Sequence, residues 1–327
     1  MRVGVLTYGL DRPLTGIGRY AAQLLRALAT LPGCPEIVLI TTEREDRHGL
    51  WSTFERHALP VGRALPSLLT VGNPLLALAA RRHDLDLIHD PNGIAPFLWL
   101  EPRARRIVTI HDTFAHVCPG HHNRLDNWRY WFMLPRAARR ADVVLTDSQH
   151  SADDLTKYLG VARGQIRAIP CGVDSAFHPV TEQSEVSDRL AHHGIAQPYL
   201  LYVGGINPRK NLARLLEAYA RLRGRHPTTR LVIVGKPQWK TDEIGATLRR
   251  LALAPHVHFT GHVAESDLPA LYSGAQAFVF PSLYEGFGLP PLEAMACGTP
   301  VITSNVSSLP EVVGDAALLV DPLDVDA

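Results

Sequence analysis

The chain has 327 residues, more than the roughly 100–200 of one domain, so two domains are expected. Hydrophobic residues make up 46% of it and charged residues 20%, which excludes a disordered or fibrous chain. The formal net charge is +1, so no overall field directs the chain to nucleic acid, and we expect no nucleic-acid partner.

Short apolar segments alternate with segments of helical period, the pattern of parallel strands joined by helices. The strands expected in the first half are 3–8, 37–41, 86–89, 107–110, 143–146 and 166–169. A helix over 20–31 places leucines on one face. The rhythm then breaks at Pro179, Pro198 and the polar stretch between them. This pattern predicts a doubly wound domain over 1–180.

The same alternation restarts in the second half of the chain. The strands expected there are 199–204, 231–235, 257–260, 277–280, 301–303 and 318–320. The first helix of this half is expected from Asn211 onward. The sequence therefore predicts a second Rossmann-like domain over 181–327 and an α/β fold of two doubly wound domains facing a cleft.

Cysteine usage and the start of the chain bear on its compartment. The four cysteines, Cys34, Cys118, Cys171 and Cys297, form no C-x-x-C pair, which argues against a zinc site or a disulfide framework. The strand-like segment 3–7 follows the first residues directly, and no apolar run approaches the ~20 residues that span a bilayer. We expect a cytoplasmic protein, at most peripheral at the inner face of the membrane.

The segment 281–298 is the strongest candidate site. It follows an expected strand, carries glycines in a loop and opens a helix through Pro290 and Pro291. Backbone N–H groups and the helix dipole at such a place favour a phosphate. Glu285 and Glu293 flank this anion site, where carboxylates suit hydroxyl-rich groups such as a ribose and a sugar. The alternative is that Glu293 stabilises its helix and that Glu285 is solvated.

Lysine is rare in this chain and therefore informative. Its lysines are Lys157, Lys210, Lys236 and Lys240. Lys210 follows an expected strand at the start of a helix, the edge of a parallel sheet where ligands bind. This position favours a lysine that neutralises phosphate over a solvated surface lysine.

Seven residues separate Glu285 from Glu293, and in this E-x7-E spacing the chain resembles the retaining GT-B glycosyltransferases of family four. The segments that carry the resemblance are 16–18, 110–112, 141–148, 169–174, 203–212 and 285–322. It spans the whole chain and is closest to the mannosyltransferase-like members. It implies transfer of a hexose, with mannose favoured, from GDP-mannose or a UDP-sugar to a glycan or lipid-linked acceptor, without a cofactor or a metal.

The resemblance also implies residue roles. Glu293 would hold the nucleotide ribose, Glu285 the hydroxyls of the donor sugar, and Lys210 the diphosphate. His111, at the end of an expected strand, would contact the donor sugar near the reacting carbon. The other implied donor-binding residues are Gly16, Gly18, Arg209, Gly286, Phe287, Gly288 and Leu289.

Glycines in two segments differ from expected patterns. Gly16 and Gly18 formally match a dinucleotide-binding fingerprint, but they come too long after the first strand. We interpret them as a flexible loop facing the donor phosphates, with an ordinary glycine loop as the alternative. Gly205 stands where many family members carry a phosphate-binding arginine, and Arg209 is the candidate replacement.

Two further segments have competing interpretations. His116, Cys118, His121 and His122 lie close in sequence but lack metal-ligand spacing, so we expect no metal there. The segment 124–140 interleaves aromatic and basic residues. It suits either packing against the sheet or contact with an anionic membrane or a lipid-diphosphate acceptor.

Other functions remain as alternatives to transfer. They are a non-catalytic subunit that binds nucleotide sugar, a GT-B epimerase or phosphorylase, and an NAD-dependent dehydrogenase. The presence of His111, Lys210, Glu285 and Glu293 together weighs against a non-catalytic subunit.

Overall fold

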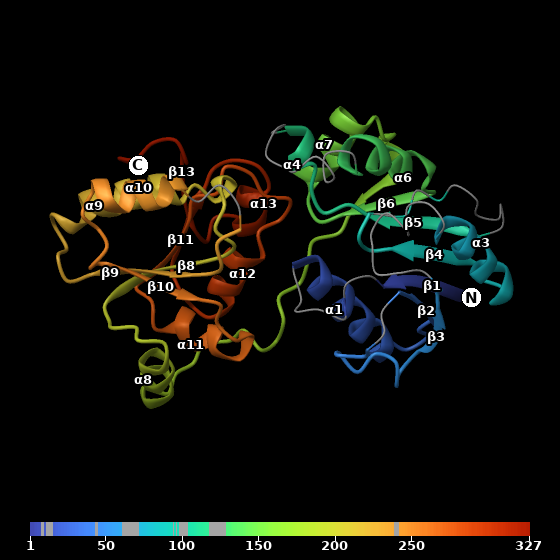
Figure 1. Ribbon diagram of the computed structural model, residues 1–327, viewed down its shortest axis with the longest axis horizontal. Coiled ribbons are helices and arrows are strands. Elements are labelled where there is room, and N and C mark those ends of the chain that lie inside the picture. Colours follow the sequence, from blue (N-terminus) through green and yellow to red (C-terminus); the bar gives the residue numbers. More distant parts are fainter. Residues whose placement is uncertain are drawn as a thin grey trace. The chain divides into compact units, whose positions relative to one another are not determined.

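The structure is a computed structural model that describes residues 1–7, 10, 16–42, 45–60, 72–93, 95, 97, 104–117, 129–238 and 242–327 (Figure 1). The chain divides into two compact units, Met1–Pro170 and Cys171–Ala327. The expected boundary near residue 180 lies inside the second unit. The reason is that Phe177 is buried in the core of that unit, with Val173 and Val180 packed against it.

The first unit contains a seven-stranded parallel sheet in the order β3-β2-β1-β4-β5-β6-β7. Its strands are β1 (Arg2–Thr7), β2 (Glu36–Thr41), β3 (Glu55–Ala58), β4 (Leu87–Asp90), β5 (Arg105–Thr109), β6 (Val143–Thr146) and β7 (Ile166–Ala168). Each except β3 falls on an expected apolar segment. β3 was not expected because its sequence, ERHA, is polar and mostly exposed.

Helices cover both faces of this sheet (Figure 1). They are α1 (Gly16–Thr30), α3 (Gly72–Arg82), α4 (Phe114–Val117), the π-helix η1 (Arg129–Met133), α6 (Leu134–Arg140), α7 (Gln149–Leu159) and the short η2 (Arg163–Gln165). Alternate residues of β2 enter opposite cores, Leu39 with α1 and Ile40 with α3, α6 and α7. The apolar segments are thus buried on both sides, as a doubly wound sheet requires.

The first helix corrects one expectation. α1 begins at Gly16 rather than at Tyr20, so Gly16 and Gly18 lie in its first turn and not in a flexible loop. Gly18 is buried.

The second unit contains a six-stranded parallel sheet in the order β10-β9-β8-β11-β12-β13. Its strands are β8 (Tyr199–Val203), β9 (Arg230–Val234), β10 (Val257–Gly261), β11 (Ala277–Phe280), β12 (Val301–Ser304) and β13 (Leu318–Val320). Each of these strands overlaps an expected segment, and the central strands β8, β9 and β11 are apolar runs that the sheet buries for the most part. The prediction of two parallel α/β units is therefore confirmed.

Figure 1 shows α9 and α10 along one face of this sheet and α8 and α11 on the other. The helices of the unit are α8 (Gln183–His192), η3 (Pro208–Lys210), α9 (Leu212–Arg223), α10 (Asp242–Arg250), η4 (Glu265–Asp267), α11 (Leu268–Ser273), α12 (Leu289–Ala296) and α13 (Leu309–Val313). Within the described parts of the chain, no helix is both long and apolar enough to cross a membrane.

The strand order places a ligand-binding edge in each unit. In the first sheet β1 lies between β2 and β4, and in the second β8 lies between β9 and β11. The chain reverses its direction of winding at these points, and the loops that follow the strands diverge there. At this edge of each sheet lie the loops after β4, β5 and β6 in the first unit and after β8 and β11 in the second.

Close backbone contact fixes the ends of β8 and β9. Gly235 has φ 149°, and a Cβ atom at this position would lie 1.9 Å from the carbonyl oxygen of Gly204. We expect Gly235→Ala to destabilise the second unit by more than about 2 kcal/mol, because neither backbone can move without breaking the sheet. Urea unfolding measures this change. Gly172→Ala is the control, since a Cβ there meets nothing within 4 Å. An equal, small effect of both variants would contradict the argument.

Candidate functional site

Two loops of the second unit meet through an ion pair. Lys210 ends η3 after β8, and Glu285 follows β11, the strand that pairs with β8. The two side chains come from positions 75 residues apart, and Lys210 Nζ lies 2.6 Å from Glu285 Oε1. Arg209 Nη1 lies 3.3 Å from the other carboxylate oxygen, Oε2. One carboxylate thus holds two cations at the carboxyl edge of the sheet.

Burial makes this cluster electrostatically strong. Lys210 is 8% exposed and Glu285 is 7% exposed. Burial alone would raise the pKa of Glu285, but the charges of Arg209 and Lys210 outweigh it and hold that pKa below its ordinary value. Lys210 Nζ also lies 4.6 Å from the ring centroid of Phe280, a cation–π contact. Two cations and one carboxylate leave a formal charge of +1, which suits an anion such as a phosphate.

Asn211 ties the two loops together. It joins η3 to α9 with a left-handed backbone, φ 60°. Its Nδ2 donates to the carbonyl oxygens of Pro281 at 3.1 Å and Pro322 at 2.7 Å. The N–H of Leu283 donates to the carbonyl of Arg209 at 2.9 Å. These bonds fix the cations next to the β11 loop. Sequence reasoning missed this function of Asn211, because its partners lie far along the chain.

The glycine turn after Glu285 is held from α13. Ser308 Oγ lies 2.9 Å from the carbonyl oxygen of Glu285 and 2.6 Å from that of Phe287, so its one O–H can donate to either of them. Gly288 precedes α12 with φ 124°, and a Cβ there would come within 2.8 Å of Leu309. The positive φ and this close approach make glycine the residue required at this position, directly before α12. The serine contact was not predicted, because nothing in the sequence links it to the turn.

Glu293 lies on α12 and is more buried than Glu285. It is 4% exposed and accepts a hydrogen bond of 3.0 Å from the hydroxyl of Tyr272 in α11. Burial, reinforced by the charge of Glu293, raises the pKa of the Cys297 thiol to about 12. The alternative that Glu285 is solvated does not hold, because Glu285 is 7% exposed, whereas a contribution of Glu293 to the stability of its own helix stays open. Tyr272 gave no signal in the sequence.

Position 205 is a glycine, and the cation beside the Oε2 atom of Glu285 comes from Arg209. A Cβ at Gly205 would lie 2.4 Å from Nε2 of Gln238. Gln238 is in turn fixed by Asn207, whose Nδ2 donates to its Oε1 at 2.7 Å. A larger residue at 205 would have to displace this amide, whereas Arg209 reaches Glu285 and also donates to the carbonyl of Tyr284 at 3.3 Å.

In the first unit, His111 lies beyond the end of β5. Its Nδ1 lies 2.6 Å from Oδ2 of Asp147, which follows β6, and its Nε2 lies 3.0 Å from the carbonyl oxygen of Pro91. The ring of Tyr20 packs edge-on against the imidazole, with centroids 4.7 Å apart. Since Tyr20 belongs to α1, the structure brings the helix of Gly16 and Gly18 next to His111. Asp147 was not a candidate from the sequence.

The two segments with competing interpretations are only partly described. Cys118, His121, His122 and residues 124–128 lie outside the described residues. His116 is buried and its ring packs at 4.8 Å on that of Trp131. Trp131 and Phe132 are 47% and 51% exposed, while the α6 residues that follow are largely buried. These two aromatic side chains therefore do not pack fully against the sheet.

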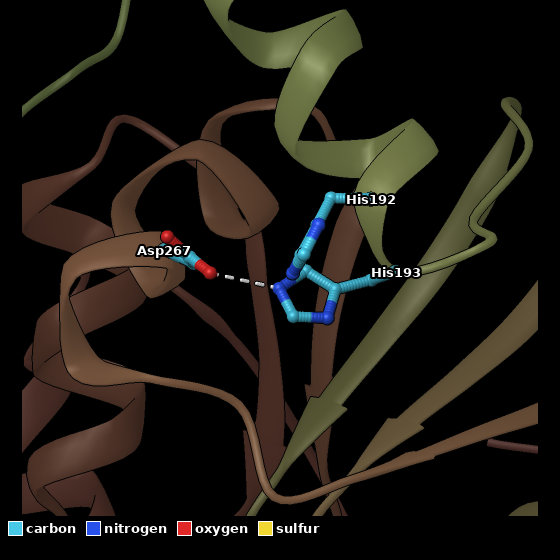
Figure 2. A group of neighbouring side chains, drawn as sticks. All are labelled: His192, His193 and Asp267. Carbon is cyan, nitrogen blue, oxygen red and sulfur yellow. Dashed lines mark hydrogen bonds and ion pairs between the residues drawn. The ribbon is translucent and has the colours of Figure 1, made fainter.

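A histidine–aspartate cluster joins α8 to η4. Figure 2 shows His192, His193 and Asp267, whose candidate ligand atoms all lie within 4.8 Å of one another. Asp267 Oδ2 already accepts from His193 Nε2 at 2.9 Å, and Oδ1 faces the guanidinium of Arg189 at 3.1 Å. A metal ion would meet the repulsion of Arg189 and would have to displace His193. The arrangement is a hydrogen-bonded connection between two helical segments.

Two parallel α/β units are the architecture of the GT-B glycosyltransferases, the class to which the structural neighbours of this chain belong. A family model described as Glycosyl transferases group 1 matches residues 191–327. A second, described as Glycosyltransferase Family 4, matches residues 14–177. The chain therefore belongs to glycosyltransferase family 4.

Individual relatives agree with this assignment. The chain is 35% identical to the O-antigen chain mannosyltransferase B of Escherichia coli, over 100% of this chain and 88% of the relative. It is 33% identical to the MMP alpha-(1->4)-mannosyltransferase of Mycolicibacterium hassiacum, over 76% of this chain and 61% of that protein. The structure resembles sucrose-phosphate synthase from Thermosynechococcus elongatus with a TM-score of 0.78 at 25% identity, covering 100% of this chain and 87% of the other.

Proposed function

We propose that the enzyme is a retaining mannosyltransferase that moves mannose from a nucleotide diphosphate sugar, GDP-mannose ahead of a UDP-sugar, to a hydroxyl of a glycan or lipid-linked acceptor. The observation that carries the proposal is the buried cluster of Lys210, Arg209 and Glu285 at the edge of the second sheet. Relatives named as mannosyltransferases support the choice of sugar.

Lys210 and Arg209 bind the diphosphate in this proposal. Their positive charges stabilise the negative charge that develops on the leaving phosphate. The backbone from Gly286 to Leu289 and the dipole of α12 add to the same effect, and Gly16 and Gly18 contribute at the start of α1. These groups supply the neutralisation that Mg²⁺ provides in other enzymes, so the proposed reaction needs no metal and no cofactor.

Glu285 and Glu293 divide the rest of the donor between them. When the diphosphate binds Lys210 and Arg209, the carboxylate of Glu285 can accept hydrogen bonds from the sugar hydroxyls. It can also stabilise the positive charge that develops at the reacting carbon. Glu293, held by Tyr272, accepts from the ribose hydroxyls. His111 contacts the sugar near the reacting carbon.

The proposed transfer is a displacement on one face of the sugar. The acceptor oxygen forms a bond to the anomeric carbon as the bond from that carbon to the phosphate oxygen breaks. The acceptor proton passes to the leaving phosphate, which departs as nucleoside diphosphate. No enzyme side chain forms a covalent bond in this step, and the product keeps the α configuration of the donor.

The acceptor side is the least specified part of the proposal. Trp131 and Phe132 are exposed beside basic residues of α6, among them Arg136. Aromatic and basic side chains together suit a membrane surface or a lipid-diphosphate acceptor. The segment accordingly supports a lipid-linked glycan acceptor with peripheral membrane contact.

The direct test is transfer from GDP-mannose to mannosyl oligosaccharides, followed by mass spectrometry of the products and by NMR of the new linkage. We expect acceptor-dependent release of GDP, an α linkage, and the same yield in the presence of EDTA. Release of GDP without acceptor would indicate an epimerase or hydrolase. Donor binding without turnover would indicate a non-catalytic subunit. Metal-reversible loss of activity in EDTA would contradict the metal-free mechanism.

Lys210→Ala should lower kcat by roughly 10²–10³-fold, because the charge on Lys210 acts mainly on the departing phosphate. Steady-state kinetics with GDP-mannose measures the loss. Lys157→Ala is the matched control, since Lys157 is fully exposed on α7 and its removal should change neither kcat nor KM. Wild-type turnover of Lys210→Ala would remove Lys210 from the mechanism.

Replacement of Glu285 and of Glu293 by glutamine should impair different kinetic constants of the enzyme. Glu293→Gln should chiefly raise KM for the donor, because ribose contacts are alike before and during the reaction. Glu285→Gln should lower kcat by about 10²–10³-fold, because its charge matters most in the transition state. Glu243→Gln, an exposed change on α10, is the control. The reverse pattern would contradict this division of roles.

A further inference from the structure

We infer that Asp147 is a positioning residue that fixes His111 as a hydrogen-bond donor at both ring nitrogens, so that His111 acts in the reaction as a cation that stabilises the negative charge on the phosphate leaving the reacting carbon, and not as a general base. The inference rests on the proposed role of His111 in transfer. It adds a residue that sequence reasoning did not identify and gives that histidine a defined protonation state.

The sheet brings the two side chains together. β5 and β6 are neighbouring parallel strands, and the N–H of Ile110 donates to the carbonyl of Leu145 at 2.9 Å. Their carboxyl ends therefore lie at the same edge of the sheet, where His111 follows β5 and Asp147 follows β6. The distance of 2.6 Å between His111 Nδ1 and Asp147 Oδ2 is that of a strong, charge-assisted hydrogen bond.

Both nitrogens of the imidazole face acceptors. A carboxylate oxygen accepts hydrogen bonds, so Nδ1 carries the proton toward Asp147. A carbonyl oxygen also only accepts, so Nε2, at 3.0 Å from the carbonyl of Pro91, carries a proton as well. A neutral imidazole has a single N–H, and only the imidazolium satisfies both contacts. Hydrogen bonding alone thus defines His111 as a cation.

Packing keeps the ring in this orientation. The side chains of His111 and Asp147 are 15% and 7% exposed, so solvent screens their attraction little. The Tyr20 ring meets the imidazole at an interplanar angle of 78°. Ser148, next to Asp147, caps α7 by accepting from the N–H of Ser151 at 3.0 Å. The carboxylate is therefore placed by a fixed helix end and not by a mobile loop.

The surrounding charges agree with a protonated His111. Burial would lower its pKa, but the hydrogen bond and charge of Asp147 outweigh burial and raise the pKa, with Pro91 and Asp112 adding to the effect. Among the described residues, His89 on β4 and Tyr20 on α1 also face the ring. Burial and the charge of His111 lower the pKa of His89 to about 4, so His89 is neutral near pH 7. The stabilising charge on His111 is present at low pH and is lost as pH rises through its raised pKa.

NMR titration of the imidazole in the enzyme without substrate tests the inference directly. In Asp147→Asn, the His111 resonance should titrate at lower pH than in the wild type, because a carboxamide offers no charge to the imidazolium. Asp153→Asn is the matched control: Asp153 lies on the same helix, α7, is 69% exposed and pairs with Arg163. An unchanged His111 titration in Asp147→Asn would overturn the inference.

The pH profile of kcat separates a cationic from a basic His111. At about pH 8, Asp147→Asn should lose roughly tenfold or more in kcat, and activity should recover as the pH is lowered. Asp147→Glu keeps the charge and should restore part of the activity at high pH, whereas a purely structural role would not depend on charge in this way. If Asp147→Asn keeps the wild-type kcat at about pH 8 and exceeds the wild type at low pH, the neutral imidazole is the active form, which would indicate a general base and overturn the inference.

The two measurements keep this inference distinct from the proposed function. The titration needs neither donor nor acceptor, so an unchanged titration rejects the role of Asp147 even in an enzyme that transfers mannose. Absence of transfer from nucleotide diphosphate mannose, with the titration shifted as expected, rejects the proposed function and leaves the hydrogen-bonded pair in place.

Discussion

The contact between Lys210 and Glu285 is the interaction on which the organisation of the second unit depends. It joins the loops after two neighbouring strands, and both partners are almost completely buried. A buried charge without a partner costs several kcal/mol, so neither loop can move away from the other without a large loss. Hydrogen bonds from Asn211 and Ser308 also stabilise this arrangement, since they hold the backbone of the two loops at the distance that the ion pair requires.

Sheet topology explains why such contacts form at these places in both units. A parallel sheet gathers residues distant in sequence at its carboxyl edge, and neighbouring strands set them within reach of each other. In the second unit the edge holds two cations around one carboxylate, Glu285. In the first it holds a carboxylate, Asp147, against the cationic imidazole of His111. The same architecture thus builds two clusters of different charge, one with two cations around one carboxylate and one in which a carboxylate pairs with a single imidazole.

The sequence predicted the elements better than the contacts between them. Buried parallel strands are recognisable because both faces are apolar, whereas the edge strand β3 is polar and pairs only with β2. The start of α1 was missed because two glycines suggested a loop. Lys210 and Glu285 were found through motif and strand-end position, but Asp147 and Tyr272 were not. Their partners lie on other strands and helices, and that proximity is a property of the tertiary fold.

The resting arrangement of the site also constrains the proposed reaction. Glu285 is buried and remains charged because Arg209 and Lys210 compensate it. If the diphosphate draws these cations to itself, the carboxylate needs new partners at once, or its burial becomes unfavourable. The hydroxyls of the sugar are such partners, because they donate hydrogen bonds to the carboxylate. The positive charge on the reacting carbon in the transition state attracts the carboxylate more strongly still. Donor binding is then an exchange of partners in which the site never holds an uncompensated charge, and the exchange is most favourable when the sugar is most cationic.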